Sequence, residues 1–293
     1  MERISYARPP GVDEALYLLN ESEINNFVLA GGTDLMLMFR MDKKLCGRVV
    51  DISEISELHE IKLTENVVTF GAAATFNEIL NNPIIKKTAP VLAQACQQVG
   101  AAQIRNMGTV GGNVANAAAC ADSIPALVCL NAIAKIKTPN GELEFPVSEL
   151  VTGPNKTKIP KGGLIISFSY QVPLPGSRSI FFKLGRRNAM AISRLTVAAL
   201  GRLDDSNTIV EARFVTGSAT PQICRIKVVE DSLIGKRPGE ELFKSSATLA
   251  TDEMIRLSGK RWSSEFKIPA LQSMTARAFS QIFITKITQQ ELS

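Results

Sequence analysis

The chain carries the stretch Ile104-Arg105-Asn106-Met107-Gly108-Thr109-Val110-Gly111-Gly112-Asn113, in which three glycines fall within five residues. Small hydroxyl and amide side chains lie between them. Because glycine has no Cβ, such a loop can adopt positive φ angles and let backbone N–H groups approach a ligand. Successive N–H groups held in this way form a concave anion site suited to phosphate. The stretch therefore predicts a phosphate-binding loop, with a tight structural turn as the alternative.

A second glycine-rich segment, Ala30-Gly31-Gly32-Thr33-Asp34, lies between the apolar run that starts at Phe27 and a helical pattern that starts at Leu35. It is either another phosphate loop or an ordinary strand-to-helix turn. Neither segment has the G-x-G-x-x-G spacing of a nicotinamide-binding Rossmann domain or the spacing of a P-loop. Two candidate phosphate loops, well separated along the chain, favour one extended diphosphate ligand. That pattern indicates a dinucleotide cofactor.

Composition narrows the class of protein. The 293 residues are 45% hydrophobic and 21% charged, which is typical of globular proteins with one large domain or two smaller ones. The net charge of +5 is spread thinly and only 6% of residues are aromatic, so nucleic-acid binding is poorly supported. The start of the sequence does not resemble a signal peptide, and no apolar run is long enough for a membrane span. We therefore expect a cytoplasmic protein.

Side chains for autonomous catalysis are scarce. His59 is the only histidine, and it lies in a charged segment where a solvated side chain is expected. The five cysteines are scattered without a C-x-x-C pair, which argues against a disulfide framework and against a zinc or iron–sulfur site. A catalytic triad or metal hydrolase is hard to build from this set. We predict no catalytic side chain and no metal ligand, so that any chemistry belongs to a cofactor.

Hydrophobic periodicity predicts an α+β protein. Pro173-Leu174-Pro175-Gly176 is the best boundary, because proline and glycine interrupt both kinds of regular structure. It divides the chain into domains of residues 1–175 and 176–293. Helices are expected at 13–20, 35–44, 76–80, 90–99, 125–131, 239–257 and 269–284. Strands are expected at 27–30, 48–52, 67–71, 134–137, 164–172, 179–184, 196–203 and 209–215.

Three charged residues are further candidates. Asp34 is a natural N-cap for the helix that follows it. Asp122 is either the cap of a helix near Ser123 or an acceptor for a ribose hydroxyl or an adenine amino group. Lys183 follows two phenylalanines on a predicted strand. It is either an edge-strand lysine that protects against aggregation or a cation placed against a flavin ring or its phosphates.

Taken together, these segments resemble the FAD-binding subunit of molybdenum hydroxylases, the group of xanthine, nicotinate and carbon monoxide dehydrogenases. The resemblance extends over nearly the whole chain. Its order and spacing make it specific, although each segment alone is weak. It is carried by Tyr6-Ala7-Arg8-Pro9-Pro10, Asp13-Glu14-Ala15, Leu29 to Leu35, Gln103 to Asn113, Asp122-Ser123 and Phe182 to Ile192.

The resemblance implies a vanillyl-alcohol-oxidase-type FAD-binding domain, with two subdomains that divide near residue 58, followed by a carbon monoxide dehydrogenase flavoprotein-like C-terminal α+β domain. It implies that the first loop wraps the pyrophosphate and that the second holds phosphate and ribose from the other side. Asp122 would bind ribose or adenine, and Lys183 would approach the ring. The implied cofactor-binding residues are Val28, Leu29, Ala30, Gly31, Gly32, Thr33, Asp34, Leu35, Val99, Gly100, Gly108, Thr109, Gly112, Asn113, Asn116, Asp122, Leu164, Ile165 and Lys183.

Two departures from the group's pattern matter. Many relatives have a serine-proline pair before the aspartate, whereas the loop Asn116 to Asp122 keeps its length but lacks that pair. Proline stiffness is therefore absent where the resemblance places cofactor contacts. The cysteine-bearing loop that the benzoyl-CoA reductase branch inserts for an extra iron–sulfur cluster has no counterpart in the sequence.

The resemblance implies an electron-transfer function within a larger enzyme. A molybdopterin-binding subunit would hydroxylate a purine, nicotinate, another N-heterocycle or an aldehyde, and a 2Fe-2S subunit would carry electrons to the FAD of this chain. NAD(P) or another acceptor would then take them, in a dimer of heterotrimers or a larger assembly. The alternatives are a stand-alone flavoprotein oxidoreductase and a non-catalytic scaffold of the same fold.

Overall fold

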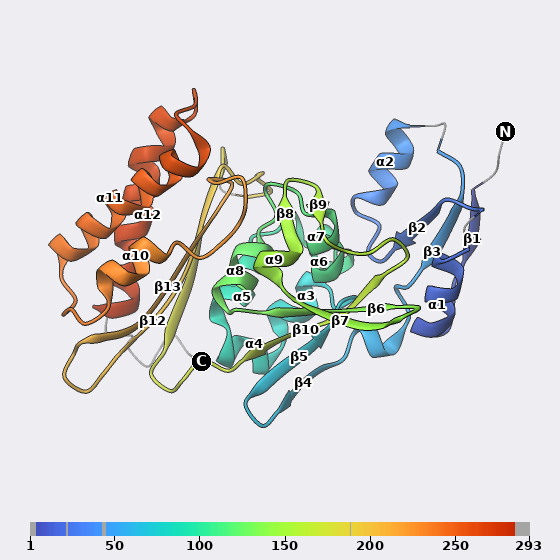
Figure 1. Cartoon of the computed structure of the whole chain (residues 1–293), viewed down its shortest axis with the longest axis horizontal. Helices are drawn as coiled ribbons and strands as arrows, with labels where there is room; N and C mark the ends of the chain where they lie inside the picture. The colour runs from blue at the N-terminus through green and yellow to red at the C-terminus, as the bar shows by residue number, and fades with distance from the viewer. Residues whose placement is uncertain (1–3, 22, 43–44, 188, 285–293) are drawn as a thin grey trace.

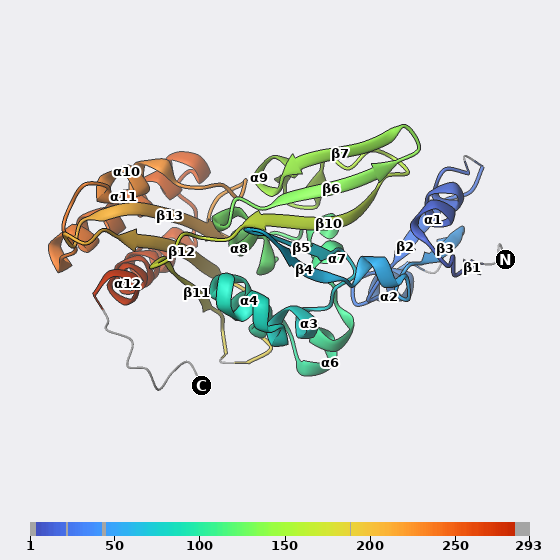
Figure 2. The same cartoon turned by 90° about the horizontal axis from the view of Figure 1, so that it is seen from below.

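A computed structural model describes residues 4–21, 23–42, 45–187 and 189–284. Its elements are arranged along one long axis, with the N-terminal strands and the C-terminal helices at opposite ends and the central helices between them (Figures 1 and 2). Lys43 and Lys44 of the predicted helix 35–44 lie outside the described residues, as does Asn188. None of the described helices is long and apolar enough to cross a membrane.

The N-terminal part is a small parallel sheet with one helix between each pair of successive strands. Its core contains Val12, Leu16, Val50, Ile55 and Leu58. The first glycine loop follows the second strand, and so connects a strand to a helix as the sequence predicted. In spatial order the strands are β1 (Ser5–Ala7), β3 (Arg48–Asp51) and β2 (Asn26–Leu29), and the helical segments are α1 (Val12–Leu19), α2 (Leu35–Met41) and the short 3-10 helix η1 (Ser56–Leu58).

The central part is an antiparallel five-stranded sheet associated with seven short helices and a two-stranded ribbon. In spatial order its strands are β4 (Ile61–Thr64), β5 (Val67–Gly71), β10 (Leu164–Gln171), β6 (Ile133–Thr138) and β7 (Gly141–Pro146). The helices are α3 (Phe76–Asn81), α4 (Pro83–Thr88), α5 (Pro90–Gln97), α6 (Ala102–Met107), α7 (Val110–Asn116), α8 (Ser123–Cys129) and α9 (Val147–Leu150). The ribbon pairs β8 (Val151–Gly153) with β9 (Lys156–Thr157).

The C-terminal part is a three-stranded antiparallel sheet that is covered on both faces. Alternate residues of its middle strand enter two different cores: Ala198 and Leu200 join the central one, and Val197 and Ala199 join the C-terminal one. This period-two pattern is what a strand buried on both faces requires. The strands are β11 (Arg178–Leu184), β12 (Leu195–Leu203) and β13 (Ile209–Gly217), and the helices are α10 (Lys227–Leu233), α11 (Glu240–Ser258) and α12 (Ser264–Phe283).

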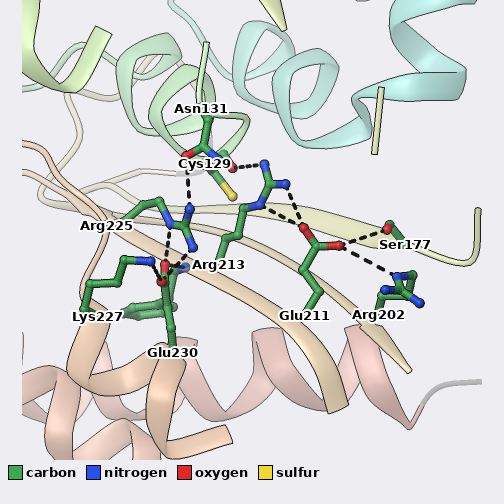
Figure 3. A network of polar contacts seen from close by, with 10 residues as sticks. Cys129, Asn131, Ser177, Arg202, Glu211, Arg213, Arg225, Lys227 and Glu230 are labelled. Atoms are coloured by element: carbon green, nitrogen blue, oxygen red, sulfur yellow. Dashed lines mark hydrogen bonds and ion pairs between the residues drawn. The ribbon is translucent and has the colours of Figure 1, made fainter. Parts of the chain in front are cut away.

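A network of hydrogen bonds and ion pairs joins the C-terminal part to the C-terminal end of α8 (Figure 3). Arg213 donates to the carbonyl of Cys129 at 3.2 Å and pairs with Glu211 at 2.7 Å. Arg225 donates to Asn131 Oδ1 at 3.1 Å and pairs with the buried Glu230 at 2.8 Å. Two arginines of the C-terminal part thus bind the chain at the end of a helix of the central part.

The structure corrects three local predictions. The side chain of Asp34 makes no capping hydrogen bond to α2. The last helix begins at Ser264, so Pro269 lies inside it rather than at its start. The glycine stretch is only partly a loop, because α7 begins at Val110 and Thr109 Oγ1 accepts a hydrogen bond from the Gly112 amide at 3.0 Å. A capping threonine therefore overcomes the low helix propensity of two glycines.

Candidate functional site

The two glycine-rich loops, far apart in sequence, meet in space at Gly31. A Cβ at this position would lie 1.8 Å from the carbonyl oxygen of Met107 and 2.9 Å from Cα of Gly108. Only glycine fits such an approach of two backbones. The structure therefore brings the two predicted loops together into one candidate site.

The first loop presents open backbone donors. Within the described chain, the N–H groups of Gly31, Gly32, Thr33 and Asp34 have no hydrogen-bond acceptor. Gly32 has a φ of +69°, which turns the backbone between β2 and α2. None of the four residues is buried. Four consecutive free N–H groups at the start of a helix fit a phosphate or pyrophosphate group.

The second loop differs from its prediction, because most of its amides are already bonded within the chain. Gly108 donates to Ile104 O at 2.7 Å, Val110 to Ala74 O at 3.1 Å and Gly111 to Ala72 O at 2.8 Å. A Cβ on Gly111 would lie 2.5 Å from the same Ala72 oxygen, so this glycine is needed for packing. The loop therefore offers shape and side chains rather than a row of free N–H groups.

Side chains near the second loop are partly accessible. Asn113 and Asn116 are half-buried on α7, and Gly112 is exposed. Asn113 Oδ1 accepts a hydrogen bond from Ser123 Oγ at 2.7 Å, which links α7 to the start of α8. Thr109 is buried and its hydroxyl is used as the helix cap. Gly112, Asn113 and Asn116 thus remain open to a ligand.

A buried ion pair joins the central and C-terminal parts beside these loops. Lys183 Nζ, on β11, lies 2.6 Å from Asp122 Oδ2, and their side chains are only 7% and 5% exposed. Lys183 also donates to the carbonyl of Gln98 at 2.8 Å, and Ser193 Oγ donates to the Asp122 carboxylate. Burial raises the pKa of Asp122, and the opposing contributions of Lys183 and Ser193 favour its charged form. Asp122 makes no capping bond to α8, and Lys183 is no solvent-exposed edge lysine.

Electrostatics connects this pair to the first loop. The pKa of the half-buried Cys120 thiol is raised, mainly by burial and then by the charge of Asp122. Lys183 and Asp34 also act on the same thiol, with opposite signs. Asp34 of the first loop therefore acts on the same thiol as the Asp122–Lys183 pair, although more weakly. The thiol of Cys120 thus senses charges from both the first loop and the buried pair.

The remaining predicted cofactor-binding residues differ in how accessible they are. Val28 is 39% exposed, and Leu29, Ala30 and Leu35 are half-buried around the first loop. Val99 and Gly100 follow α5, next to the Gln98 carbonyl that Lys183 binds. Leu164 and Ile165 are 5% and 4% exposed and pack in two different cores, so their side chains are not brought to the open site.

Sequence reasoning missed Cys120, Ser193 and Arg105 as parts of this region. Cys120 and Ser193 carry no motif, and tertiary structure alone places Ser193 against Asp122. Arg105 lies within a quoted motif, but its contacts with the carbonyls of Val99 and Gly100 depend on how α6 folds back.

A cavity of about 490 Å³ adjoins the buried pair. Cys120, Ser193 and Trp262 line it, and Trp262 is 81% exposed. The lining also includes three cations, Arg194, Arg261 and Lys267, none of which forms an ion pair within the described part of the chain. Burial, followed by the charges of Arg261 and Arg194, lowers the pKa of Lys267. An unpaired cationic cluster in a cavity of this size suits a small anionic ligand.

Comparisons with known proteins agree over the whole length. Residues 2–175 match the family described as FAD binding domain in molybdopterin dehydrogenase, and residues 180–282 match the CO dehydrogenase flavoprotein C-terminal domain. The chain is 30% identical to the glyceraldehyde dehydrogenase medium chain of Sulfolobus acidocaldarius, covering 95% of this chain and 98% of that protein. It is also 30% identical to the xanthine dehydrogenase FAD-binding subunit of Escherichia coli O157:H7, covering 94% and 95%.

The fold is that of solved dehydrogenase structures. A chain of the carbon monoxide dehydrogenase from Hydrogenophaga pseudoflava, in a form that lacks the Mo-pyranopterin moiety of its molybdenum cofactor, superposes with a TM-score of 0.87. The similarity covers 96% of this chain and 97% of that chain at 23% identity. The predicted α+β architecture, an FAD-binding domain followed by a flavoprotein C-terminal domain, is therefore confirmed.

Proposed function

Because the chain belongs to the FAD-binding family of the molybdopterin dehydrogenases, we propose that it is the electron-transfer subunit of a multi-subunit molybdenum hydroxylase. FAD is its cofactor and oxidoreduction its class of reaction. In this proposal a partner subunit with molybdopterin hydroxylates the organic substrate, and a 2Fe-2S subunit delivers electrons. This chain collects them and passes them to NAD(P) or another acceptor.

The observation that carries the proposal is the conjunction of open amides and a buried cation. The free N–H groups from Gly31 to Asp34 fit the pyrophosphate of FAD, because a dinucleotide carries two adjacent phosphates. That loop contains no lysine or arginine, so its backbone N–H groups would bind the phosphates. Gly112, Asn113 and Asn116 would contact the phosphate and ribose from the other loop. Asp122 would accept hydrogen bonds from hydroxyl or N–H groups of the cofactor.

In this proposal Lys183 would tune a bound flavin through its charge. Bound FAD supplies the redox chemistry, exchanging one or two electrons at its ring. Lys183 Nζ is fixed by two acceptors, Asp122 Oδ2 and Gln98 O, so its positive charge stays in one place. A fixed cation in a low-dielectric environment stabilises negative charge that develops nearby. The chain thus contributes binding, orientation and electrostatics rather than an acid or base.

Helix α2 supports the presence of a partner subunit. Six of its seven residues are hydrophobic, and none is buried. Met36, Leu37, Met38 and Met41 are 56%, 54%, 41% and 88% exposed. A helix that is apolar all round is normally buried, and an exposed apolar patch marks an interaction surface. Since α2 starts directly after the first loop, a subunit that covers it would lie beside the cofactor, where electrons must enter.

The cationic cavity supports an anionic electron acceptor. Arg194, Arg261 and Lys267 offer three positive charges for phosphate groups, and Trp262 offers a flat ring for stacking against a base. Ser193 contacts both this cavity and Asp122, so an acceptor here would lie next to the flavin region. NAD(P) has the required phosphates and aromatic rings.

Anaerobic absorption spectroscopy of the co-purified complex tests the proposal. The flavin bands should bleach when an oxidisable N-heterocycle or aldehyde is added and should return when NAD(P)⁺ or an artificial acceptor follows. The isolated chain, loaded with FAD, should not bleach with the same organic compounds. Bleaching by the isolated chain would instead favour a stand-alone flavoprotein oxidoreductase. Absence of FAD from both samples would favour a scaffold.

A further inference from the structure

Three successive carbonyls after α5 are held by two cations. Lys183 Nζ binds Gln98 O at 2.8 Å, and Arg105 Nη1 binds Val99 O at 3.1 Å and Gly100 O at 3.3 Å. These carbonyls lie at the C-terminal end of a helix, where unpaired carbonyl groups concentrate negative charge. Lys183 has an assigned place in the proposed cofactor site, whereas Arg105 has none.

Helix α6 closes tightly over this turn. Gly100 has a φ of +46°, and a Cβ there would lie 2.9 Å from Cβ and Cγ2 of Ile104. The next residue, Arg105, is half-buried and forms no ion pair with any described carboxylate. Its guanidinium is therefore directed to two backbone oxygens rather than to an acidic side chain. Its charge is not neutralised by an acidic partner.

Planarity of the peptide bond turns these contacts into a constraint on the opposite side of the turn. In a trans peptide, the C=O and the following N–H point in opposite directions. Fixing Val99 O and Gly100 O on Arg105 therefore directs the N–H groups of Gly100 and Ala101 away from it. Neither N–H has an acceptor within the described chain. The turn thus presents two free donors, next to the backbone that Lys183 ties to Asp122.

We propose that Arg105 is a positioning residue for the flavin: it fixes the two peptide planes so that the N–H groups of Gly100 and Ala101 donate to the bound ring system. This inference rests on the proposed function. Donors that are held in place stabilise negative charge on a reduced ring more than donors that must reorient. Arg105 acts through the backbone and does not itself touch the cofactor.

Variants of Arg105 in the complete complex test this. Arg105→Met removes both contacts and should weaken FAD binding about tenfold, which corresponds to the loss of about one backbone hydrogen bond to the cofactor. It should also make the flavin harder to reduce, and so lower its midpoint potential. Arg105→Lys keeps the charge but cannot hold two carbonyls with one planar group. It should lie between the wild type and Arg105→Met in both measurements.

The control is Arg237→Met, which removes one positive charge from an exposed position with no ion pair in the described chain. It should leave FAD affinity and potential unchanged. The midpoint potential of the flavin is the decisive measurement. A variant that only weakens the fold would lower the melting temperature and leave this potential unchanged. If Arg105→Met does not fold, Arg105→Lys is measured by the same criteria.

Wild-type affinity and wild-type potential in either folded Arg105 variant would overturn the inference and leave the proposed function intact. Failure of the wild-type complex to take up FAD would instead contradict the proposed function, and this inference with it.

Discussion

At the residue scale, the Asp122–Lys183 pair gives the sharpest expectation. Lys183→Met leaves a buried carboxyl without its cation, which typically costs about 3 kcal/mol. It also removes a contribution that lowers the pKa of Asp122, so that pKa rises further above its ordinary value. The folded state then binds a proton more tightly than the unfolded state. The contribution of Asp122 to stability should therefore be fully present in acid and be lost as pH rises through the raised pKa.

Urea unfolding of Lys183→Met between pH 4 and pH 8 checks this expectation. Relative to the wild type, the free energy of unfolding of the variant should decrease as pH rises. In the double variant Lys183→Met/Asp122→Asn no carboxyl remains to titrate, and the added slope should vanish. Equal slopes in the single and double variants would show that Asp122 does not respond to Lys183.

Gly32 permits a matched test of the first loop. A Cβ there would meet Leu29 Cδ1 at 3.0 Å, and the φ of +69° disfavours any side chain. Gly259 has the same φ with open space around it. Valine at either position should therefore cost about 1–3 kcal/mol of stability through backbone strain. Only Gly32→Val should also lose bound FAD, measured as flavin released per chain. Equal flavin contents in the two variants would contradict the placement of the pyrophosphate.

At this scale, sequence located the strand-to-helix turn of the first loop but not the contacts that depend on tertiary structure. Gly31 and Gly32 could be recognised from sequence, because glycine at a strand-to-helix turn has a direct backbone meaning. The partners of Asp122 could not, since Lys183 is 61 residues away and Ser193 is 71 residues away. The free amides were expected in the second loop as well, but neighbouring carbonyls such as Ala72 O occupy them.

At the element scale, α2 is the helix whose surroundings are incomplete. Replacing Leu37 and Met41 together by glutamate changes only exposed side chains, so thermal stability and FAD content should stay near wild type. Co-purification of partner subunits should be lost or strongly reduced, as measured by size-exclusion chromatography with light scattering. Leu174→Glu, at a 58% exposed position outside the helices and strands, is the control. An intact complex in the double variant would show that α2 is not covered by a partner.

Success did not depend on the length of an element, since the four-residue strands β2 and β3 were expected at 27–30 and 48–52, whereas the start of the 20-residue helix α12 was misjudged. The strands that became β10 to β13 and the helices that became α5, α8 and α11 were found because their apolar residues repeat with the correct period. Helix α7 was missed because glycine signals a loop, whereas Thr109 and the packing of Gly111 against Ala72 hold it in a helix. The start of α12 was misjudged because Pro269 was interpreted as a first-turn proline.

At the scale of the whole molecule, hydrogen bonds from Arg213 and Arg225 join the C-terminal part to the end of α8, and the ion pairs in Figure 3 hold these two arginines in place. Glu230 is 2% exposed and accepts hydrogen bonds from Arg225 and from the Phe214 amide. Arg225→Met should lower the free energy of unfolding by about 3 kcal/mol, measured by urea unfolding. Within the described chain, the buried Glu230 carboxylate then keeps only the Phe214 amide and the exposed Lys227 as partners. Lys227→Met removes a 65% exposed partner of the same carboxylate and should cost less than about 1 kcal/mol. Equal losses in the two variants would contradict this assignment.

The arrangement of the parts follows from these contacts. The proposed cofactor region is assembled from three parts of the chain: the first loop is N-terminal, the region around α7 and α8 is central, and β11 is C-terminal. No single segment is sufficient, which explains why sequence motifs located its pieces without locating their contacts. It also means that fastening the C-terminal sheet to α8 helps to keep Lys183 in register with Asp122.

The most direct test of FAD binding is to purify the protein together with its co-purifying subunits, and to release and identify its chromophore. FAD is then titrated into any apoprotein fraction. We expect flavin absorption bands, release of FAD on acid treatment and close to one FAD per chain at saturation. A colourless protein that does not bind added FAD, even with its partners present, would contradict the central claim.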